Sequence, residues 1–197
     1  MRSRAVGTLA GVVGPAVVAL ALWLVGAPRA ELLSVGDGRG AMFPGSGAAG
    51  GSQLLVLLVV LGAAAVCAAL VLWWRHPGLR RPRGVAALTG IPALTCAVAA
   101  AAATPLADLL LSPPEDAPAG VVLALPPEVG PLFWGPMVYG EYGPSWGALP
   151  GGLGWFVFGA TLAAFTVAVL AHFSASADLS DGAEPVTSPD PAAAPGA

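Results

Sequence analysis

Residues 53–74 read QLLVLLVVLGAAAVCAALVLWW, and this stretch decides the fold. It contains no charged residue, and as an α-helix rising about 1.5 Å per residue it would be about 33 Å long. A helix needs about 20 apolar residues to cross the hydrocarbon core of a bilayer, which is about 30 Å thick. The stretch therefore predicts a transmembrane helix.

Three further apolar runs have a similar length. They cover residues 6–25, 85–108 and 153–173. The first could be a secretory signal peptide, because Arg2 and Arg4 precede it, but it exceeds the usual apolar core of about 7–15 residues. The best small-residue cleavage site, at Gly26 and Ala27, is followed by Pro28, a poor residue at a cut. We therefore expect an uncleaved span and an all-α, membrane-embedded bundle of four transmembrane helices.

The composition of the whole chain agrees with a membrane protein. Of its 197 residues, 56% are hydrophobic and 10% are charged, whereas soluble domains carry about 25% charged residues. The net charge is -3, and the basic residues form no stripe that could follow a phosphate backbone, so nucleic acid is not an expected partner. All basic residues are Arg, and Ala, Gly and Pro abound, which suggests a GC-rich bacterial genome, such as that of an actinobacterium.

The positions of the Arg residues predict the orientation of the spans. Arg2 and Arg4 precede the first span, and the turn between the second and third spans carries Arg75, Arg80, Arg81 and Arg83. Arg-rich segments stay on the cytoplasmic side, so both termini are expected in the cytoplasm, with outer loops at residues 27–52 and 112–152. Residues 1–174 then form the transmembrane domain. The acidic tail, residues 175–197, is rich in Pro, Ala and Ser, and we expect it to be disordered and cytoplasmic.

Tryptophans fall at the predicted ends of the spans. They are Trp23, Trp73, Trp74 and Trp155. Amphipathic rings prefer the headgroup region, so we expect these four side chains at the membrane–water interface.

Small residues are expected to hold the helices together, because lipid tails are as apolar as Leu and only close backbone approach favours association. Gly7 and Gly11 form a GxxxG pair in the first span. The last span repeats alanine every four residues, at Ala160, Ala164 and Ala168. The unbroken run Ala99–Ala103 predicts that the third span is packed centrally. In the second span, the inner half around residues 62–68 should pack more tightly than the Leu-rich outer half.

No catalytic, cofactor-binding or metal-binding site is predicted. The spans lack ionisable residues in their central portions, and Asp108 is expected at the outer interface. Residues 143–147, GPSWG, fit the G-x-S-x-G pattern of hydrolases, but no strand is predicted before them. The two histidines, His76 and His172, are predicted on the opposite side of the membrane. We interpret the pattern as a chance match in a glycine-rich chain.

The two cysteines are expected to be packed, unpaired thiols. Cys67 would lie about 10 Å from the inner end of its helix and Cys96 about 16 Å from the inner end of its own. A disulfide needs Cα atoms within about 7 Å, which this difference in depth disfavours.

Two surfaces are candidates for contacts with other molecules. The first is the aromatic outer stretch at residues 121–155, whose candidate partner-binding residues are Trp134, Tyr139, Glu141, Tyr142 and Trp146. Such a stretch could lie on the outer leaflet, fold back over the helix bundle or bind a partner. The second is the basic turn, whose candidate contacts with anionic lipid are Arg75, Arg80, Arg81 and Arg83. Each Arg would contribute about 1 kcal/mol, although topology alone would also account for them.

Several short strings resemble a family of actinobacterial four-span membrane proteins, a domain of unknown function. They are WLVGAPR at 23–29, the Arg-rich turn, the alanine-rich third span, LPP at 125–127 with FWG at 133–135, and ASADL at 175–179. The similarity covers residues 5–180 approximately, with no match in the Gly-rich first outer loop. It implies a four-span topology and brings no catalytic residues.

These observations favour a non-enzymatic accessory or scaffold subunit of a bacterial plasma membrane, with the lipid bilayer and other membrane proteins as partners. One alternative is a small transporter or transporter subunit, suggested by small-residue helices that contain proline. A water-lined cavity faced by the span threonines, Thr89, Thr95, Thr161 or Thr166, would favour it. The other alternative is a membrane enzyme acting on lipid or cell-wall precursors, which would need acidic or His residues gathered at one depth.

Overall fold

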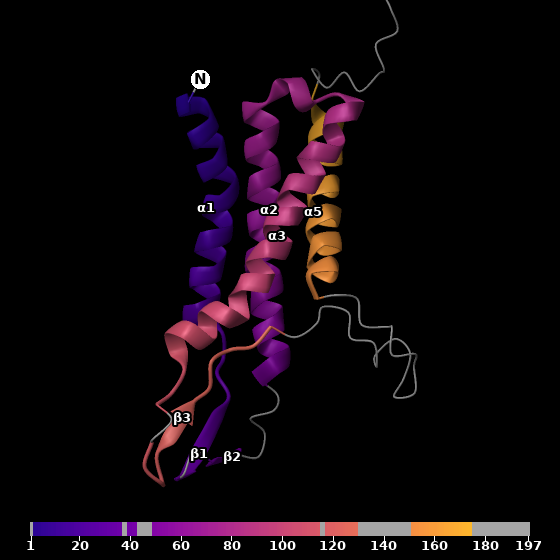
Figure 1. The fold of residues 1–197 in the computed structure, drawn as a ribbon. Helices are drawn as coiled ribbons and strands as arrows, with labels where there is room; N and C mark the ends of the chain where they lie inside the picture. The colour runs from indigo at the N-terminus through magenta and orange to yellow at the C-terminus, as the bar shows by residue number, and fades with distance from the viewer. Residues whose placement is uncertain (1, 37–38, 43–48, 115–116, 130–150, 175–197) are drawn as a thin grey trace, which may run out of the picture.

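Four long helices dominate the computed structural model, which describes residues 2–36, 39–42, 49–114, 117–129 and 151–174 (Figure 1). They are α1 (Arg2–Gly26), α2 (Ala49–Arg75), α3 (Pro82–Leu111) and α5 (Gly151–Phe173). Each is long and apolar enough to cross a membrane. One such helix covers each of the four predicted spans, and together they indicate a multi-pass membrane protein. Every helix begins before the predicted span, and α3 begins at Pro82, a residue that is tolerated in a first turn.

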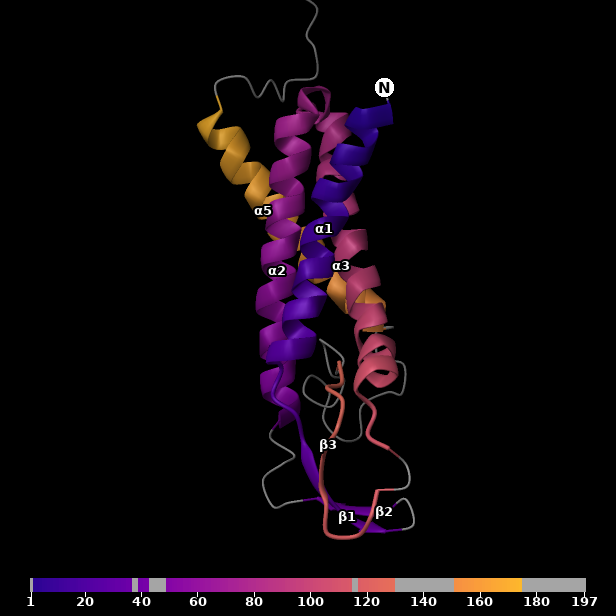
Figure 2. The same cartoon turned by 90° about the vertical axis from the view of Figure 1, so that its left-hand side faces the viewer.

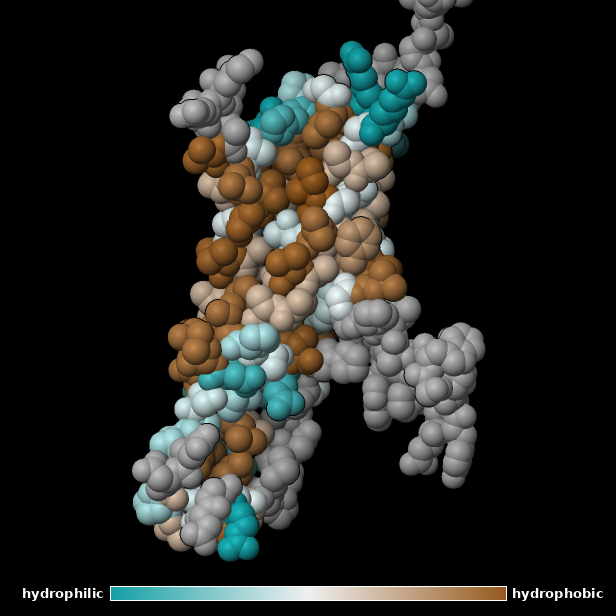
Figure 3. Space-filling model, viewed as in Figure 1, coloured by the Kyte–Doolittle hydropathy of each residue, from teal (hydrophilic) through white to brown (hydrophobic). Residues whose placement is uncertain are grey.

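A broad apolar band surrounds the middle of the bundle. Figure 3 shows hydrophobic side chains along the helices and hydrophilic ones gathered at the two ends. Large apolar side chains point outward within this band, among them Val59 and Phe165, which are 70% and 69% exposed. Apolar surface of this extent would be unfavourable in water and is favourable in hydrocarbon.

Helix α3 crosses the bundle at a tilt and packs against all three other helices, as its alanines predicted (Figures 1 and 2). Helix α2 also packs against all three, so the centre of the bundle is a pair of helices. The half of α2 that was expected to pack more tightly is the more buried one, because Ala64, Ala65, Ala68, Ala69, Leu72 and Trp73 are all buried.

A close backbone approach joins α5 to α3. A Cβ atom on Gly159 would lie 2.9 Å from Cys96 Cβ and 3.0 Å from Ala93 Cα. On α1, Gly11 packs against Val71 of α2, where an added Cβ would be 2.7 Å from Cγ1. The GxxxG pair therefore belongs to the contact between α1 and α2.

The alanine repeat of α5 does not form the packing face that was predicted. Ala164 and Ala168 are exposed. The buried face carries Trp155, Gly159, Ala163 and Val167, which also recur every four residues. The helix turns this face inward because Gly159 admits the backbone of α3 and Trp155 anchors one end of the core.

Three of the four tryptophans at the ends of the spans are buried between helices, and one is exposed. Trp23, Trp73 and Trp155 are 0%, 2% and 2% exposed, and only Trp74 is open, at 69%. The buried rings fill the spaces between helices near the two ends of the bundle. The Trp23 indole does not need headgroup water, because its Nε1 donates a hydrogen bond to the Gln53 carbonyl at 3.1 Å.

A small antiparallel sheet extends beyond one end of the bundle, so the all-α prediction is incomplete (Figures 1 and 2). Its order is β2 (Arg39–Met42), β1 (Glu31–Gly36), β3 (Val122–Ala124). Leu32 pairs with Met42 on one side and with Leu123 on the other. Both segments expected as outer loops contribute strands, and Gly36 ends β1 at a φ of 86°, which favours glycine.

We predict that Gly159→Leu destabilises the bundle and that Gly90→Leu does not. A side chain at Gly159 must displace the α3 backbone, whereas nothing lies within 4 Å of an added Cβ at Gly90. Overpacking of this kind costs about 1–3 kcal/mol. Unfolding of the purified variants in mixed detergent micelles measures the difference. Equal stability of the two variants would show that the α3–α5 contact is not as close as described.

Candidate functional site

The buried side chain of Gln53 joins three segments at the sheet end of the bundle. Its Nε2 donates a hydrogen bond to the Pro28 carbonyl at 2.7 Å, and its Oε1 accepts one from the Glu128 backbone N–H at 3.3 Å. Its own carbonyl accepts the Trp23 indole N–H. One residue at the start of α2 therefore fixes the end of α1 and the segment that follows β3.

The segment after β3 is held by further contacts with the bundle. The Val129 backbone N–H donates to Thr104 Oγ1 of α3 at 3.0 Å, and the Leu125 N–H donates to the Ala30 carbonyl at 2.8 Å. Pro127 between them is fully buried. Residues 125–129 thus lie fixed against α2 and α3.

Ser34 fastens β1 to the segment that precedes β3. Its Oγ donates to the Ala117 carbonyl at 3.0 Å and accepts the Gly36 N–H at 3.3 Å. Its backbone N–H donates to the Val121 carbonyl, and its carbonyl accepts the Gly120 N–H. Ser34 and Gln53 are both buried polar residues, and each finds partners inside the protein.

We call the sheet together with residues 125–129 the outer platform, after the two segments predicted as outer loops that contribute to it. It exposes large apolar side chains outside the helical spans, with Val35 at 53%, Val121 at 41% and Val122 at 52%. Leu33 pairs with Val122 across β1 and β3, which puts these two side chains on one face of the sheet. A rigid surface with apolar groups is suited to contact with another molecule.

The predicted aromatic contact residues, Trp134, Tyr139, Glu141, Tyr142 and Trp146, lie outside the described residues, as does the GPSWG string.

Sequence reasoning missed Gln53, Ser34 and Thr104. A single amide at the start of an apolar run was the available signal for Gln53. Nothing in the sequence indicated which backbone groups it would meet.

The four Arg residues of the basic turn occupy different environments at the opposite end of the bundle. Arg80 donates from Nε and Nη2 to the Trp73 carbonyl at 3.1 and 3.0 Å, and its guanidinium lies 5.1 Å from the Trp73 ring centroid. The Arg75 guanidinium packs over Gly7 of α1. Arg81 and Arg83, at the start of α3, are exposed.

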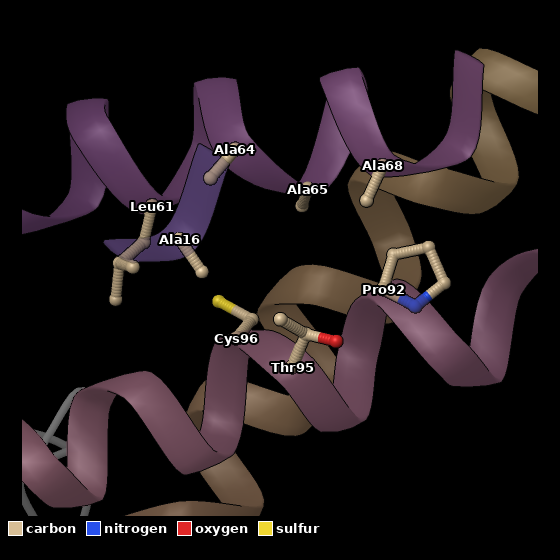
Figure 4. A pocket seen from close by; sticks show the side chains of 8 residues that line it. All are labelled: Ala16, Leu61, Ala64, Ala65, Ala68, Pro92, Thr95 and Cys96. Atoms are coloured by element: carbon tan, nitrogen blue, oxygen red, sulfur yellow. The ribbon is translucent and has the colours of Figure 1, made fainter. Parts of the chain in front are cut away.

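The interior between the helices is apolar and tightly filled. The void in Figure 4 lies among α1, α2 and α3, is lined mainly by alanines and has no room for a water molecule. Thr95 borders it, yet its hydroxyl donates to the Ile91 carbonyl of its own helix at 2.9 Å. Thr89, Thr161 and Thr166 bond in the same way within their helices. Two apolar grooves of about 250 and 310 Å³ flank α1 on its lipid-facing sides.

Reactive groups in the described part of the chain are dispersed. No group of three or more His, Cys, Asp or Glu side chains there could hold a metal ion. Cys67 is exposed and Cys96 is buried, and both are free thiols. Asp108 is exposed near the end of α3, where its carbonyl accepts the Ser112 hydroxyl at 2.6 Å. His76 Nε2 lies 3.1 Å from Thr8 Oγ1 and joins the basic turn to α1.

We predict that Gln53→Leu loosens the outer platform. The substitution fills similar space but leaves the Pro28 carbonyl and the Glu128 N–H without their partner, which costs about 1–3 kcal/mol. Limited proteolysis of the outer segments and thermal unfolding in detergent measure the effect. Thr161→Val is the control, because it removes a hydroxyl that bonds only within its own exposed helix turn. Equal behaviour of both variants would contradict the role of Gln53.

Comparisons of the chain with protein-family models, with curated proteins and with solved structures found no match. The resemblance to actinobacterial four-span proteins stays a prediction from the strings quoted above.

Proposed function

We propose that this protein is a non-enzymatic accessory or scaffold subunit of a bacterial plasma membrane, and that its outer platform binds a partner protein. The observation that carries this proposal is the fixed position of the platform. Ordering a backbone costs about 1–2 kcal/mol per residue in conformational entropy. A segment that only connects two spans has no functional need for a fixed position. Here Gln53, Thr104 and Ser34 all hold it.

The exposed face of the platform supports the same proposal. Val35 and Val122 are more than half exposed although they lie outside the apolar band of the helices. A rigid surface loses little conformational entropy on binding, and apolar side chains at its centre supply the gain. The aromatic stretch that follows residue 129 in the sequence would extend this surface.

The packed interior makes transport the weaker candidate. A path through the bundle needs water or polar groups that face a cavity, whereas the span threonines bond to their own helices. The void among α1, α2 and α3 has no room for water. These contacts favour a supporting role for the helices.

The orientation in this proposal places the basic turn and both termini in the cytoplasm. Its support is the separation of charge, because the Arg-rich turn lies at the end of the bundle opposite the sheet (Figure 1). The platform would then be outside the cell.

We predict that reporter fusions after Gly45, Arg80, Glu128 and Asp181 read outside, inside, outside and inside. The reason is the preference of Arg-rich segments for the cytoplasm. Activities of a periplasmic and a cytoplasmic reporter at each site give the measurement. Any other order of the four readings defeats the proposed orientation.

We predict that Val35→Ser with Val122→Ser removes a specific partner from the protein isolated after cross-linking in native membranes. The double variant keeps the strand backbone and removes only exposed apolar surface. Val59→Ser is the matched control, because this valine is also exposed but lies on α2 within the apolar band. The variant Trp134→Ala with Trp146→Ala tests the adjoining aromatic stretch. Partners that are unchanged in both double variants would contradict the proposal.

A further inference from the structure

In the basic turn, the guanidinium groups of Arg75 and Arg80 contact the rest of the bundle, whereas those of Arg81 and Arg83 do not. Arg80 uses two nitrogens on the Trp73 carbonyl and lies over the rings of Trp73 and Trp74, at 5.1 and 5.9 Å. Its charge thereby stabilises the C-terminal end of α2, where carbonyl groups lack helical partners. Arg80 is half-buried and is occupied by this structural role.

Arg81 and Arg83 are free to meet another molecule. Both are exposed, and neither guanidinium group has a hydrogen-bond or ion-pair partner within the part of the chain that the structure describes. No Asp or Glu among the described residues at this end of the bundle offsets their charge. Figure 3 shows hydrophilic side chains that project from the bundle near the start of α3.

The turn that carries these two residues has a fixed shape. The Leu79 N–H donates to the His76 carbonyl at 2.9 Å, and the Arg80 N–H donates to the Pro77 carbonyl at 3.1 Å. The backbone of Gly84 packs directly on the backbone of Leu79, which leaves no space for a side chain at position 84. Arg81 and Arg83 are therefore held at a constant position relative to α3.

The depth of the two residues corresponds to the headgroup layer. They precede Val85, where the apolar run of α3 begins, by about 3–6 Å of helix rise. Trp74, at the same end of the bundle, is 69% exposed, as expected for a ring at the boundary between headgroups and hydrocarbon.

We propose that Arg81 and Arg83 bind the phosphate of an anionic phospholipid in the adjacent leaflet. The guanidinium group matches phosphate through paired N–H donors, and the net positive charge favours anionic over zwitterionic lipid. Control of topology requires only positive charge on this side, which Arg75 and Arg80 also supply, and does not require exposed side chains on a fixed turn. The proposal goes beyond the outer platform and holds for either orientation of the chain.

The test is lipid binding by the purified full-length protein in detergent, measured by native mass spectrometry with phosphatidylglycerol or phosphatidylcholine. The wild type should bind the first phosphatidylglycerol more tightly than phosphatidylcholine. Arg81→Gln and Arg83→Gln should each weaken phosphatidylglycerol binding about fivefold, and Arg81→Lys with Arg83→Lys should retain most of the preference. Equal affinity of the wild type for the two lipids, or an unchanged preference after both Gln substitutions, would overturn the proposal.

Controls separate this site from general charge and from the fold. Arg29→Gln with Arg39→Gln, at the sheet end of the bundle, should leave the lipid preference unchanged. Arg80→Gln should lower the thermal stability, and it should reduce the lipid preference less than Arg81→Gln or Arg83→Gln does. Inorganic phosphate at millimolar concentration should not displace the lipid, because it lacks acyl chains. Displacement by inorganic phosphate, or an equal loss of preference in the sheet-end variant, would also overturn the assignment to lipid.

Discussion

Close approach of helix backbones is the constraint on which the rest of the structure depends. In hydrocarbon, contact between large apolar side chains gains little over contact with lipid, so glycine and alanine must bring the helices together. Gly159 of α5 meets Ala93 and Cys96 of α3, and the alanines of α3 share one buried cluster with α1 and α2. The void that this packing leaves among α1, α2 and α3 has no room for a water molecule. The hydroxyl of Thr95 therefore bonds to its own helix, and the bundle becomes an apolar support for its two polar ends.

The outer platform is ordered because the bundle holds it. Strands of six, four and three residues are too short to form a stable sheet alone. Gln53 supplies the link, since a buried amide is costly unless it is paired, and its partners lie on both outer segments. Thr104 adds a second link from α3. The position of the platform is therefore set by its hydrogen bonds to Gln53 of α2 and Thr104 of α3.

Features of this protein that depend on local composition could be predicted, and features that depend on tertiary partners could not. The four spans follow from the length and apolarity of each run. The buried position of Trp23 depends on the Gln53 carbonyl, a partner that its own run does not contain. In α5, small residues recur every four positions on two faces of the helix, one with Gly159 and one with Ala164. Contact with α3 determines that the face with Gly159 is buried. The sheet escaped prediction because β3 is short and pairs with a strand far away in the sequence. The polar contacts of Gln53 and Ser34 were missed because their partners also lie far away in the sequence.

The two ends of the bundle use polar residues in different ways. At the sheet end, Gln53 and Ser34 are buried and form their hydrogen bonds within the protein. At the other end, neighbouring residues of one type divide these roles, since Arg80 completes α2 while Arg81 and Arg83 remain exposed. The three residues carry the same charge. Only Arg81 and Arg83 can bind a ligand without breaking a contact within the protein. Because Arg80 and Gly84 fix the turn on both sides, the entropy that a mobile loop would lose on binding is already lost on folding. A headgroup site therefore needs only two unpaired guanidinium groups on a turn that the fold has made rigid.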